Sequence, residues 1–256
     1  MKGRHVIAVE DFHKTYGETV AVSGISFDVA AGDILGLVGP NGAGKTTTLK
    51  TLSGVIPPTR GRLTVQGFDV QRDAVEVKRR LAYVPDDPQL FPDLSVDQHL
   101  AFTAAAYEVD GADERATQLV ELFELTAKRK TPARDLSRGM RQKLAICCAF
   151  LHDPAALLFD EPLTGLDPRG IRMLKESICC RAEQGAAVIV SSHLLAMVED
   201  ICTRVLIIDA GQPRFCGTFD ELKEKFGSSQ PAASLEQIFF LATESTPASA
   251  ATANVG

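Results

Sequence analysis

Residues 39 to 47 read Gly39-Pro40-Asn41-Gly42-Ala43-Gly44-Lys45-Thr46-Thr47 and match the pattern GxxxxGK[ST]. An apolar run, Ile34–Val38, precedes this phosphate loop, and a helical pattern, Lys45–Leu52, follows it. The glycines let successive backbone N–H groups face one anion, and the helix N-terminus adds positive potential. The stretch therefore predicts a strand–loop–helix unit that binds a nucleoside triphosphate. Lys45 is expected to reach the β- and γ-phosphates, and the Thr46 hydroxyl to ligate Mg²⁺.

Short apolar runs alternate with helical patterns on both sides of this loop, which favours a mainly parallel α/β sheet. The strand candidates are Val6–Val9, Ile25–Val29, Ile34–Val38, Arg62–Val65, Leu81–Val84, Ala156–Phe159, Ala187–Val190, Arg204–Ile208 and Pro213–Cys216. The helix candidates are Lys45–Leu52, Val75–Arg80, Arg138–Leu151, Arg169–Glu183 and Leu194–Cys202.

The chain divides into one main domain and a C-terminal extension. Residues 1–227 are expected to form the α/β domain, with a helical insertion at about 93–151 where the sequence has helical periodicity and no good strand. Residues 228–243 are expected to hold a linker and a short amphipathic helix. Residues 244–256 are almost all Ala, Ser and Thr, a composition typical of disorder.

Composition narrows the class of protein. The 256 residues, 45% of them hydrophobic, suffice for a core without disulfide or metal staples. The net charge of −6 gives no electrostatic reason to expect nucleic-acid binding. No apolar run approaches the ~18 residues that a membrane span needs, and Val6 to Val9 is too short for a signal-peptide core. The six cysteines form no CxxC pattern, so we interpret them as reduced core residues.

A second acidic site follows the strand candidate Ala156–Phe159. Asp160 is placed to hold Mg²⁺, and Glu161 to polarise the attacking water as a general base. Adjacent strand residues point to opposite faces, so the strand must end near Asp160 if both carboxylates serve one site. Pro162 favours such an ending, because proline cannot donate to a strand ladder.

The phosphate loop and the acidic pair are accompanied by a third motif, which resembles the signature motif of the ABC (ATP-binding cassette) ATPase family. It reads Leu136-Ser137-Arg138-Gly139-Met140-Arg141-Gln142. The family form is LSGGQ; here Arg138 replaces one of the two Gly and Met140 the Gln, a variant similar to those of single-domain exporter-type ATPases. Ser137 and Gly139 are kept. Ser137 would cap a helix whose free N–H groups face a γ-phosphate.

Other segments resemble the family in order, over roughly Val6 to Phe226. Gly165-Leu166-Asp167 resembles the loop that links the two active sites of the dimer. Ser191-Ser192-His193 resembles the switch histidine, which the family places against the γ-phosphate and the attacking water. Tyr16 stands where the family stacks an aromatic on adenine, with Val22 expected beside the ring.

One position departs from the family. Gln usually follows the strand that matches Leu81–Val84 and the Pro85 after it, touching Mg²⁺ and facing the membrane partner; here Asp86 stands there. Asp86 can still bind Mg²⁺ as a charged oxygen ligand, but an ionised carboxylate cannot donate a hydrogen bond. Exporter-type members that resemble this chain often carry an acid at this position, so it does not indicate a loss of activity.

The resemblance implies a P-loop ABC ATPase fold, with a mainly parallel core sheet, an antiparallel β subdomain and a helical subdomain that carries the signature. Two chains, a homodimer or a pair with a paralogous ATPase, would pack head to tail around two ATP and Mg²⁺. Each ATP would meet residues 39–47 of one chain and Ser137, Arg138, Gly139 and Met140 of the other, with Asp167 between the subunits. Hydrolysis would drive export through permease subunits on separate chains, which would hold this cytoplasmic protein on the inner face of the cell membrane.

Three other readings remain open. A soluble ABC ATPase that acts on ribosomes or DNA would usually carry two cassettes, a coiled coil or a zinc insertion, and the sequence shows one cassette, no heptad run and no CxxC pair. A P-loop signalling switch would want an NKxD motif, which is absent, and a small-molecule kinase would not need the signature or His193. A catalytically dead subunit would not need to keep Lys45, Asp160 and Glu161.

Overall fold

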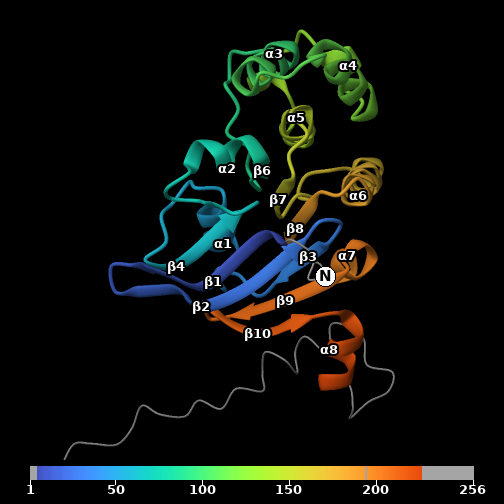
Figure 1. The fold of residues 1–256 in the computed structure, drawn as a ribbon. Helices are drawn as coiled ribbons and strands as arrows, with labels where there is room; N and C mark the ends of the chain where they lie inside the picture. Colours follow the sequence, from blue (N-terminus) through green and yellow to red (C-terminus); the bar gives the residue numbers. More distant parts are fainter. Residues whose placement is uncertain (1–4, 194, 227–256) are drawn as a thin grey trace, which may run out of the picture.

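The protein, in a computed structural model, is described for residues 5–193 and 195–226 (Figure 1). Its strands form two sheets. A four-stranded antiparallel sheet has the order β2-β1-β4-β5, and a six-stranded sheet has the order β10-β9-β3-β8-β7-β6. All neighbours in the second sheet are parallel except β10, which pairs antiparallel with β9. The predicted fold class is confirmed.

The six-stranded sheet is the centre of the molecule. Its β3 (Ile34–Val38) and β7 (Ala156–Asp160) are buried at every residue, because layers cover both faces of the sheet. One face packs on helices α5 to α7, and the other on the antiparallel sheet and α1. The remaining strands are β6 (Leu81–Val84), β8 (Ala187–Ser192), β9 (Arg204–Asp209) and β10 (Gln212–Gly217).

The antiparallel sheet is larger than the sequence predicts. Its strands are β1 (His5–Tyr16), β2 (Thr19–Ala30), β4 (Arg60–Val65) and β5 (Phe68–Asp69), and β5 was not predicted. The polar outer halves of β1 and β2 pair across a tight turn at Gly17, where φ is +56°. Their hydrophobic alternation is weak, which is why the prediction covered only the apolar ends of each strand.

Residues 93–151, between β6 and β7, are mainly helical. This segment, the helical insertion, consists of α3 (Val96–Tyr107), α4 (Ala112–Leu122) and α5 (Arg138–Leu151), with two short 3₁₀ turns, and lies at one end of the molecule in Figure 1. The structure describes all of residues 93–151, and there it has no strand beyond an isolated bridge between Ser95 and Pro132. Ser95 caps α3 in a capping box with Gln98.

The other helices flank the sheets: α1 (Lys45–Leu52), α2 (Ala74–Arg80), α6 (Pro168–Glu183), α7 (Leu195–Ile201) and α8 (Phe219–Phe226). The sequence analysis missed α8. The expected linker, amphipathic helix and tail at 228–256 lie outside the described residues. Among the described residues, no helix has the length and apolar character to cross a bilayer. The described cysteines are all free, and those residues contain no cluster suited to a metal.

Candidate active site

The phosphate loop connects the carboxyl end of β3 to α1. Gly44 has φ +104° and Gly42 has φ +82°, values that side-chain-bearing residues rarely adopt. A Cβ on Gly39 would lie 2.2 Å from the carbonyl oxygen of Ile208, and one on Gly44 would lie 2.7 Å from that of Ala21. The loop therefore requires glycine at positions 39 and 44 for its packing, and at positions 42 and 44 for its conformation.

The loop borders a cavity of about 290 Å³, here called the phosphate cavity. Its walls are Ala21, Asn41, Gly42, Ala43, Gly44, Lys45, Thr46, Thr47, Asp86, Asp160 and Glu161. Two separate parts of the sequence, the phosphate loop and the acidic strand end, thus meet at one cavity, as predicted.

Lys45 is the cation of this cavity and is only 7% exposed. Its ammonium donates to the carbonyl oxygens of Gly39 at 2.7 Å and Pro40 at 3.3 Å. Burial lowers the pKa of Lys45, while the carboxylates of Glu161 and Asp160 oppose this shift. A buried cation held by neutral carbonyls at the start of a helix suits an anionic phosphate.

Asp160 is 2% exposed, and both of its carboxylate oxygens accept hydrogen bonds from hydroxyl groups. Ser191 on β8 donates to Oδ1 at 2.6 Å, and Tyr83 on β6 donates to Oδ2 at 3.2 Å. Burial and the nearby Asp160 charge raise the pKa of Tyr83, so its hydroxyl stays protonated and able to donate. The carboxylate is thus held from both neighbouring strands, and its placement beside Thr46 on the cavity wall fits a metal ligand.

Glu161 faces the same cavity because the chain turns sharply after Asp160. The strand β7 ends at Asp160, and Glu161 adopts a left-handed conformation with φ +47°. Its N–H donates to the carbonyl oxygen of Ser191 at 3.1 Å and to the Ser191 hydroxyl at 3.2 Å. The predicted strand ending is confirmed. A non-glycine residue in this conformation costs roughly 1–3 kcal/mol and is typical of functional sites.

The Glu161 carboxylate lies between two partners. Its Oε2 lies 2.8 Å from His193 Nδ1, and its Oε1 lies 3.9 Å from the Lys45 ammonium. Glu161, His193 and Lys45, which are far apart in the sequence, therefore meet within one contact network. This is the arrangement expected of a base with an orienting histidine.

The signature segment, residues 136–142, begins α5. Ser137 is the N-cap, and its hydroxyl accepts from the Met140 N–H at 3.3 Å, as predicted. A Cβ on Gly139 would lie 2.5 Å from the carbonyl oxygen of Gly165, so only glycine fits there. Asp167 caps α6 by accepting from the Gly170 N–H at 2.7 Å. The signature segment and the Gly165–Asp167 loop are thus packed together, and neither lines the phosphate cavity.

Tyr16 and Val22 are the two residues predicted to contact the adenine ring. Tyr16 lies at the end of β1 and is about half exposed, and the Lys14 ammonium lies over its ring, 4.8 Å from the ring centre; stacking of adenine on Tyr16 stays a prediction. Val22 is fully buried, and its contact with adenine stays a prediction. Val22 packs under the phosphate loop, where a Cβ on Gly44 would lie 3.1 Å from its methyl group.

Asp86 lines the phosphate cavity, but its carboxylate has a partner that the sequence did not reveal. Its Oδ1 lies 3.2 Å from Arg138 Nη2, at the start of α5. Asp86 and Arg138, two of the three residues that depart from the family pattern, therefore form an ion pair. Sequence reasoning also missed Tyr83 and Ser191, although Ser191 pairs directly with Asp160 in the parallel register of β7 and β8.

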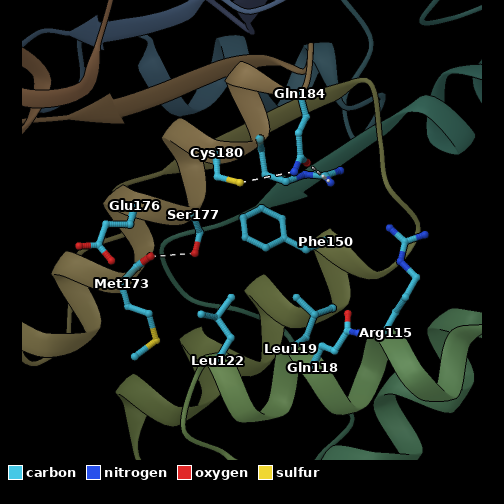
Figure 2. A pocket seen from close by; sticks show the side chains of 11 residues that line it. Arg115, Gln118, Leu119, Leu122, Phe150, Met173, Glu176, Ser177, Cys180 and Gln184 are labelled. Carbon is cyan, nitrogen blue, oxygen red and sulfur yellow. Dashed lines mark hydrogen bonds between the residues drawn. The ribbon is translucent and has the colours of Figure 1, made fainter.

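A further cavity, of about 410 Å³, lies between α4, α5 and α6 (Figure 2). Its walls are mainly apolar, with Leu119, Leu122, Phe150 and Met173, and no predicted site residue lines it. Of the charged groups at its rim, Arg181 already pairs with an aspartate outside the cavity. This cavity lies where the helical insertion packs against α6. It is lined by neither the phosphate loop nor the carboxylates Asp160 and Glu161.

The fold and these contacts define a P-loop ATPase with a signature segment on an inserted helical subdomain. The family model described as "ABC transporter" matches residues 22–164, and the chain belongs to this family. Its members include the linearmycin resistance ATP-binding protein LnrL of Bacillus subtilis, 34% identical over 87% of this chain and 72% of that protein. The Nod factor export ATP-binding protein I of Cupriavidus metallidurans is 34% identical over 81% of this chain and 69% of its own length.

A solved structure gives the same result. The ATP-binding subunit of an ABC transporter superposes with a TM-score of 0.88 at 32% identity, covering 93% of this chain and 99% of that one. The chain is therefore an ATP-binding, ATP-hydrolysing subunit of the ABC transporter class.

Proposed function

We propose that this subunit forms a head-to-tail dimer around two Mg²⁺·ATP and drives export through separate membrane permease subunits. The observation that carries the proposal is the contact network of Glu161, which joins a base, an orienting histidine and the phosphate-binding lysine at one cavity. Such a network serves hydrolysis and would be superfluous in a subunit that only bound nucleotide.

The residues that would hold the metal are Thr46 and Asp160, both on the cavity wall. Hydroxyl and carboxylate oxygens are the ligands that Mg²⁺ prefers. When bound, Mg²⁺ would neutralise charge that develops on the phosphate groups during hydrolysis. Asp86 faces the same cavity, but its Oδ1 is engaged by Arg138, so we assign it no fixed place among the ligands.

Glu161 would take the proton of the attacking water. Its Oε2 is occupied by His193 Nδ1, which leaves Oε1, on the Lys45 side, to accept that proton. His193 fixes the orientation of the carboxylate, and Lys45 would move from the loop carbonyls to phosphate oxygens. The role of Glu161 is the predicted one, whereas the contact of His193 with the γ-phosphate and the attacking water stays a prediction beside its contact with Glu161.

The second copy supplies the signature segment. Residues 137–140 do not line the phosphate cavity of their own chain, so the N–H groups at the start of α5 form no part of its wall. Ser137 and Gly139 nevertheless form a helix N-terminus suited to phosphate. A second copy or a paralogous ATPase, packed head to tail, would bring the signature segment of one chain to the cavity of the other, with Asp167 between them.

The permease would dock on a groove of about 840 Å³ that joins the core to the helical insertion. Asp86, Asp87 and Gln89 line one side, and Thr103 and Tyr107 of α3 line the other. Export is favoured by the names of relatives, which include a resistance protein and a Nod factor export protein. Docking on a permease would hold the subunit at the cytoplasmic face of the membrane.

The test uses Glu161→Gln, which keeps the shape of the side chain and removes the base. This variant should bind ATP, accumulate as a dimer with Mg²⁺·ATP, and turn over at least ~100-fold more slowly. Purified from mild detergent with ATP, it should carry a multi-span membrane protein in comparable amount. Near-normal turnover would refute the base, and recovery of ribosomal or DNA-repair proteins in place of a membrane protein would refute the transport role.

A further inference from the structure

The Asp86–Arg138 ion pair joins the core of the molecule to the helical insertion. Asp86 follows β6 of the six-stranded sheet, and Arg138 is the first residue of α5. The two residues lie 52 positions apart in the sequence, and their charged atoms lie 3.2 Å apart. Each side chain is about half exposed, at 46% for Asp86 and 49% for Arg138. Water and ions can therefore reach the pair, and competing charges can break it.

Arg138 is held in place by its neighbours on the opposite side. A Cβ on Gly165 would lie 3.1 Å from Arg138 Cδ, so the aliphatic stem packs on the backbone of Gly165. The next residue, Gly139, approaches the carbonyl oxygen of the same glycine. Arg138 thus connects the Gly165–Asp167 loop, through its stem, with Asp86, through its guanidinium.

Asp86 also belongs to the phosphate cavity, whose wall it shares with Lys45, Thr46 and Asp160. Any occupant of that cavity comes close to the ion pair. Magnesium–ATP brings both signs of charge. A divalent cation beside Thr46 and Asp160 attracts the Asp86 carboxylate, and the phosphate groups attract the Arg138 guanidinium. Each half of the ligand therefore competes for one half of the pair.

We propose that the Asp86–Arg138 pair is a nucleotide-sensitive tie: it holds the start of the signature helix toward the phosphate cavity of its own chain, and bound Mg²⁺·ATP breaks it. This inference rests on the proposed function, because it takes Mg²⁺·ATP as the occupant. It makes Asp86 and Arg138 positioning residues that report the state of the cavity to the signature segment. It also gives a joint role to two of the three departures from the family pattern.

The expected size of the effect follows from the exposure of the pair. An ion pair this exposed stabilises by a small amount, equivalent to at most about a fivefold change in an equilibrium constant. If Mg²⁺·ATP must break the pair, the unaltered chain loses this stabilisation on binding, and the neutralised variants do not. The affinity of the unaltered chain for Mg²⁺·ATP should then be up to about fivefold lower than the value expected if the effects of the two single substitutions were additive. The effect should shrink in high salt, because salt screens exposed charges.

The experiment is a double-mutant cycle with Asp86→Asn, Arg138→Gln and the double variant. The affinity for a fluorescent ATP analogue is measured by titration of dilute protein, with Mg²⁺ and with EDTA, and the unfolding free energy is measured without nucleotide. We expect favourable coupling between the two positions in stability. In Mg²⁺·nucleotide affinity we expect coupling of opposite sign, up to about fivefold at low salt. The swapped variant Asp86→Arg with Arg138→Asp should recover part of the stability coupling.

The control is the exposed Arg172–Glu176 pair on α6, which lies outside the phosphate cavity. The same cycle with Arg172→Gln and Glu176→Gln should give no coupling in nucleotide affinity. Coupling at 86 and 138 in stability but not in affinity would overturn the proposal, since the tie would then persist with nucleotide bound. Absence of coupling in both would overturn it as well. If the unaltered chain bound no Mg²⁺·nucleotide, the proposed function would fail, and this inference with it.

Discussion

Replacing Ser191 with alanine should damage the metal site while leaving the nucleotide site nearly intact. The Ser191 hydroxyl is fully buried, donates to Asp160 Oδ1 at 2.6 Å and accepts from the Glu161 N–H at 3.2 Å. After Ser191→Ala the Glu161 N–H keeps the Ser191 carbonyl, and Asp160 keeps the Tyr83 hydroxyl. The loss is therefore one short hydrogen bond to a charged group.

The magnitude follows from that contact. A hydrogen bond to a charged group contributes about 1.5–3 kcal/mol, and the loss of a group that orients a metal ligand typically lowers metal affinity or activity about 10–100-fold. The Ser191 contact is short, so we expect the upper part of this range for Ser191→Ala. Tyr83 donates to Asp160 Oδ2 at the longer distance of 3.2 Å. Tyr83→Phe should therefore lie near the lower end, at about 10-fold.

The assay separates the metal from the nucleotide. Affinity for a fluorescent ATP analogue is measured in EDTA and across a Mg²⁺ titration, with the rate of ATP hydrolysis recorded over the same titration. Affinity in EDTA should change less than about threefold in either variant, since neither hydroxyl lines the phosphate cavity, whereas the Mg²⁺ requirement should rise in both. Ser177→Ala is the matched control, because it removes a hydroxyl that donates within α6. Equal loss of affinity with and without Mg²⁺ would refute the metal-positioning role, and so would an unchanged Mg²⁺ requirement.

Three more outcomes can be checked. Lys45→Ala should weaken ATP binding by about 10–100-fold in a titration, because a charged phosphate contact is lost; unchanged affinity would contradict its role. Gly139→Ala should lower ATPase activity with little change in nucleotide affinity, because its methyl group would meet the carbonyl oxygen of Gly165; normal activity would refute this close packing. Burial lowers the pKa of His152 to about 4, below its unfolded value, so it destabilises the fold as pH falls from about 6.5 toward 4. In His152→Gln, the fall in the free energy of unfolding between about pH 6.5 and pH 4 should be smaller by about 2–3 kcal/mol. If the free energy of unfolding fell equally steeply with pH in both proteins, His152 would not be buried in its neutral form.

The sequence was most informative where burial is complete. The bounds of β3, β6, α1 and α5 agree with their predicted ranges. β3 lies in the centre of the parallel sheet and is apolar throughout, and β6, at the edge of that sheet, is a short apolar run after a helix. Helices α1 and α5 begin at residues whose chemistry marks the start. The extended halves of β1 and β2 and the short β5 and α8 were missed, because their polar residues obscure the pattern. Local sequence cannot reveal strands that form only when a partner pairs with them.

The sequence allowed individual residues of the candidate site to be predicted, but not the side chains that hydrogen-bond to them. The phosphate loop, Asp160, Glu161 and His193 could be recognised because each follows a recognisable strand. Partners that belong to neighbouring strands could not, since the sequence does not state which strands are adjacent. Ser191 was the most accessible of these, because it shares a segment with His193. Tyr83 required the pairing of β6 with β7, which only the structure gives.

Asp86 and Arg138, two of the three departures from the family pattern, are better understood together than singly. An acid at position 86 alone would place a further negative charge on a cavity that must accept phosphate groups. Arg138 alone would place a cation on the backbone of Gly165, without a counter-charge. With their charged atoms 3.2 Å apart, each neutralises the other, and the cavity gains no net charge from the exchange. The physical cost of either change therefore depends on the other, which is why a reversed pair should be tolerated better than either reversed charge alone.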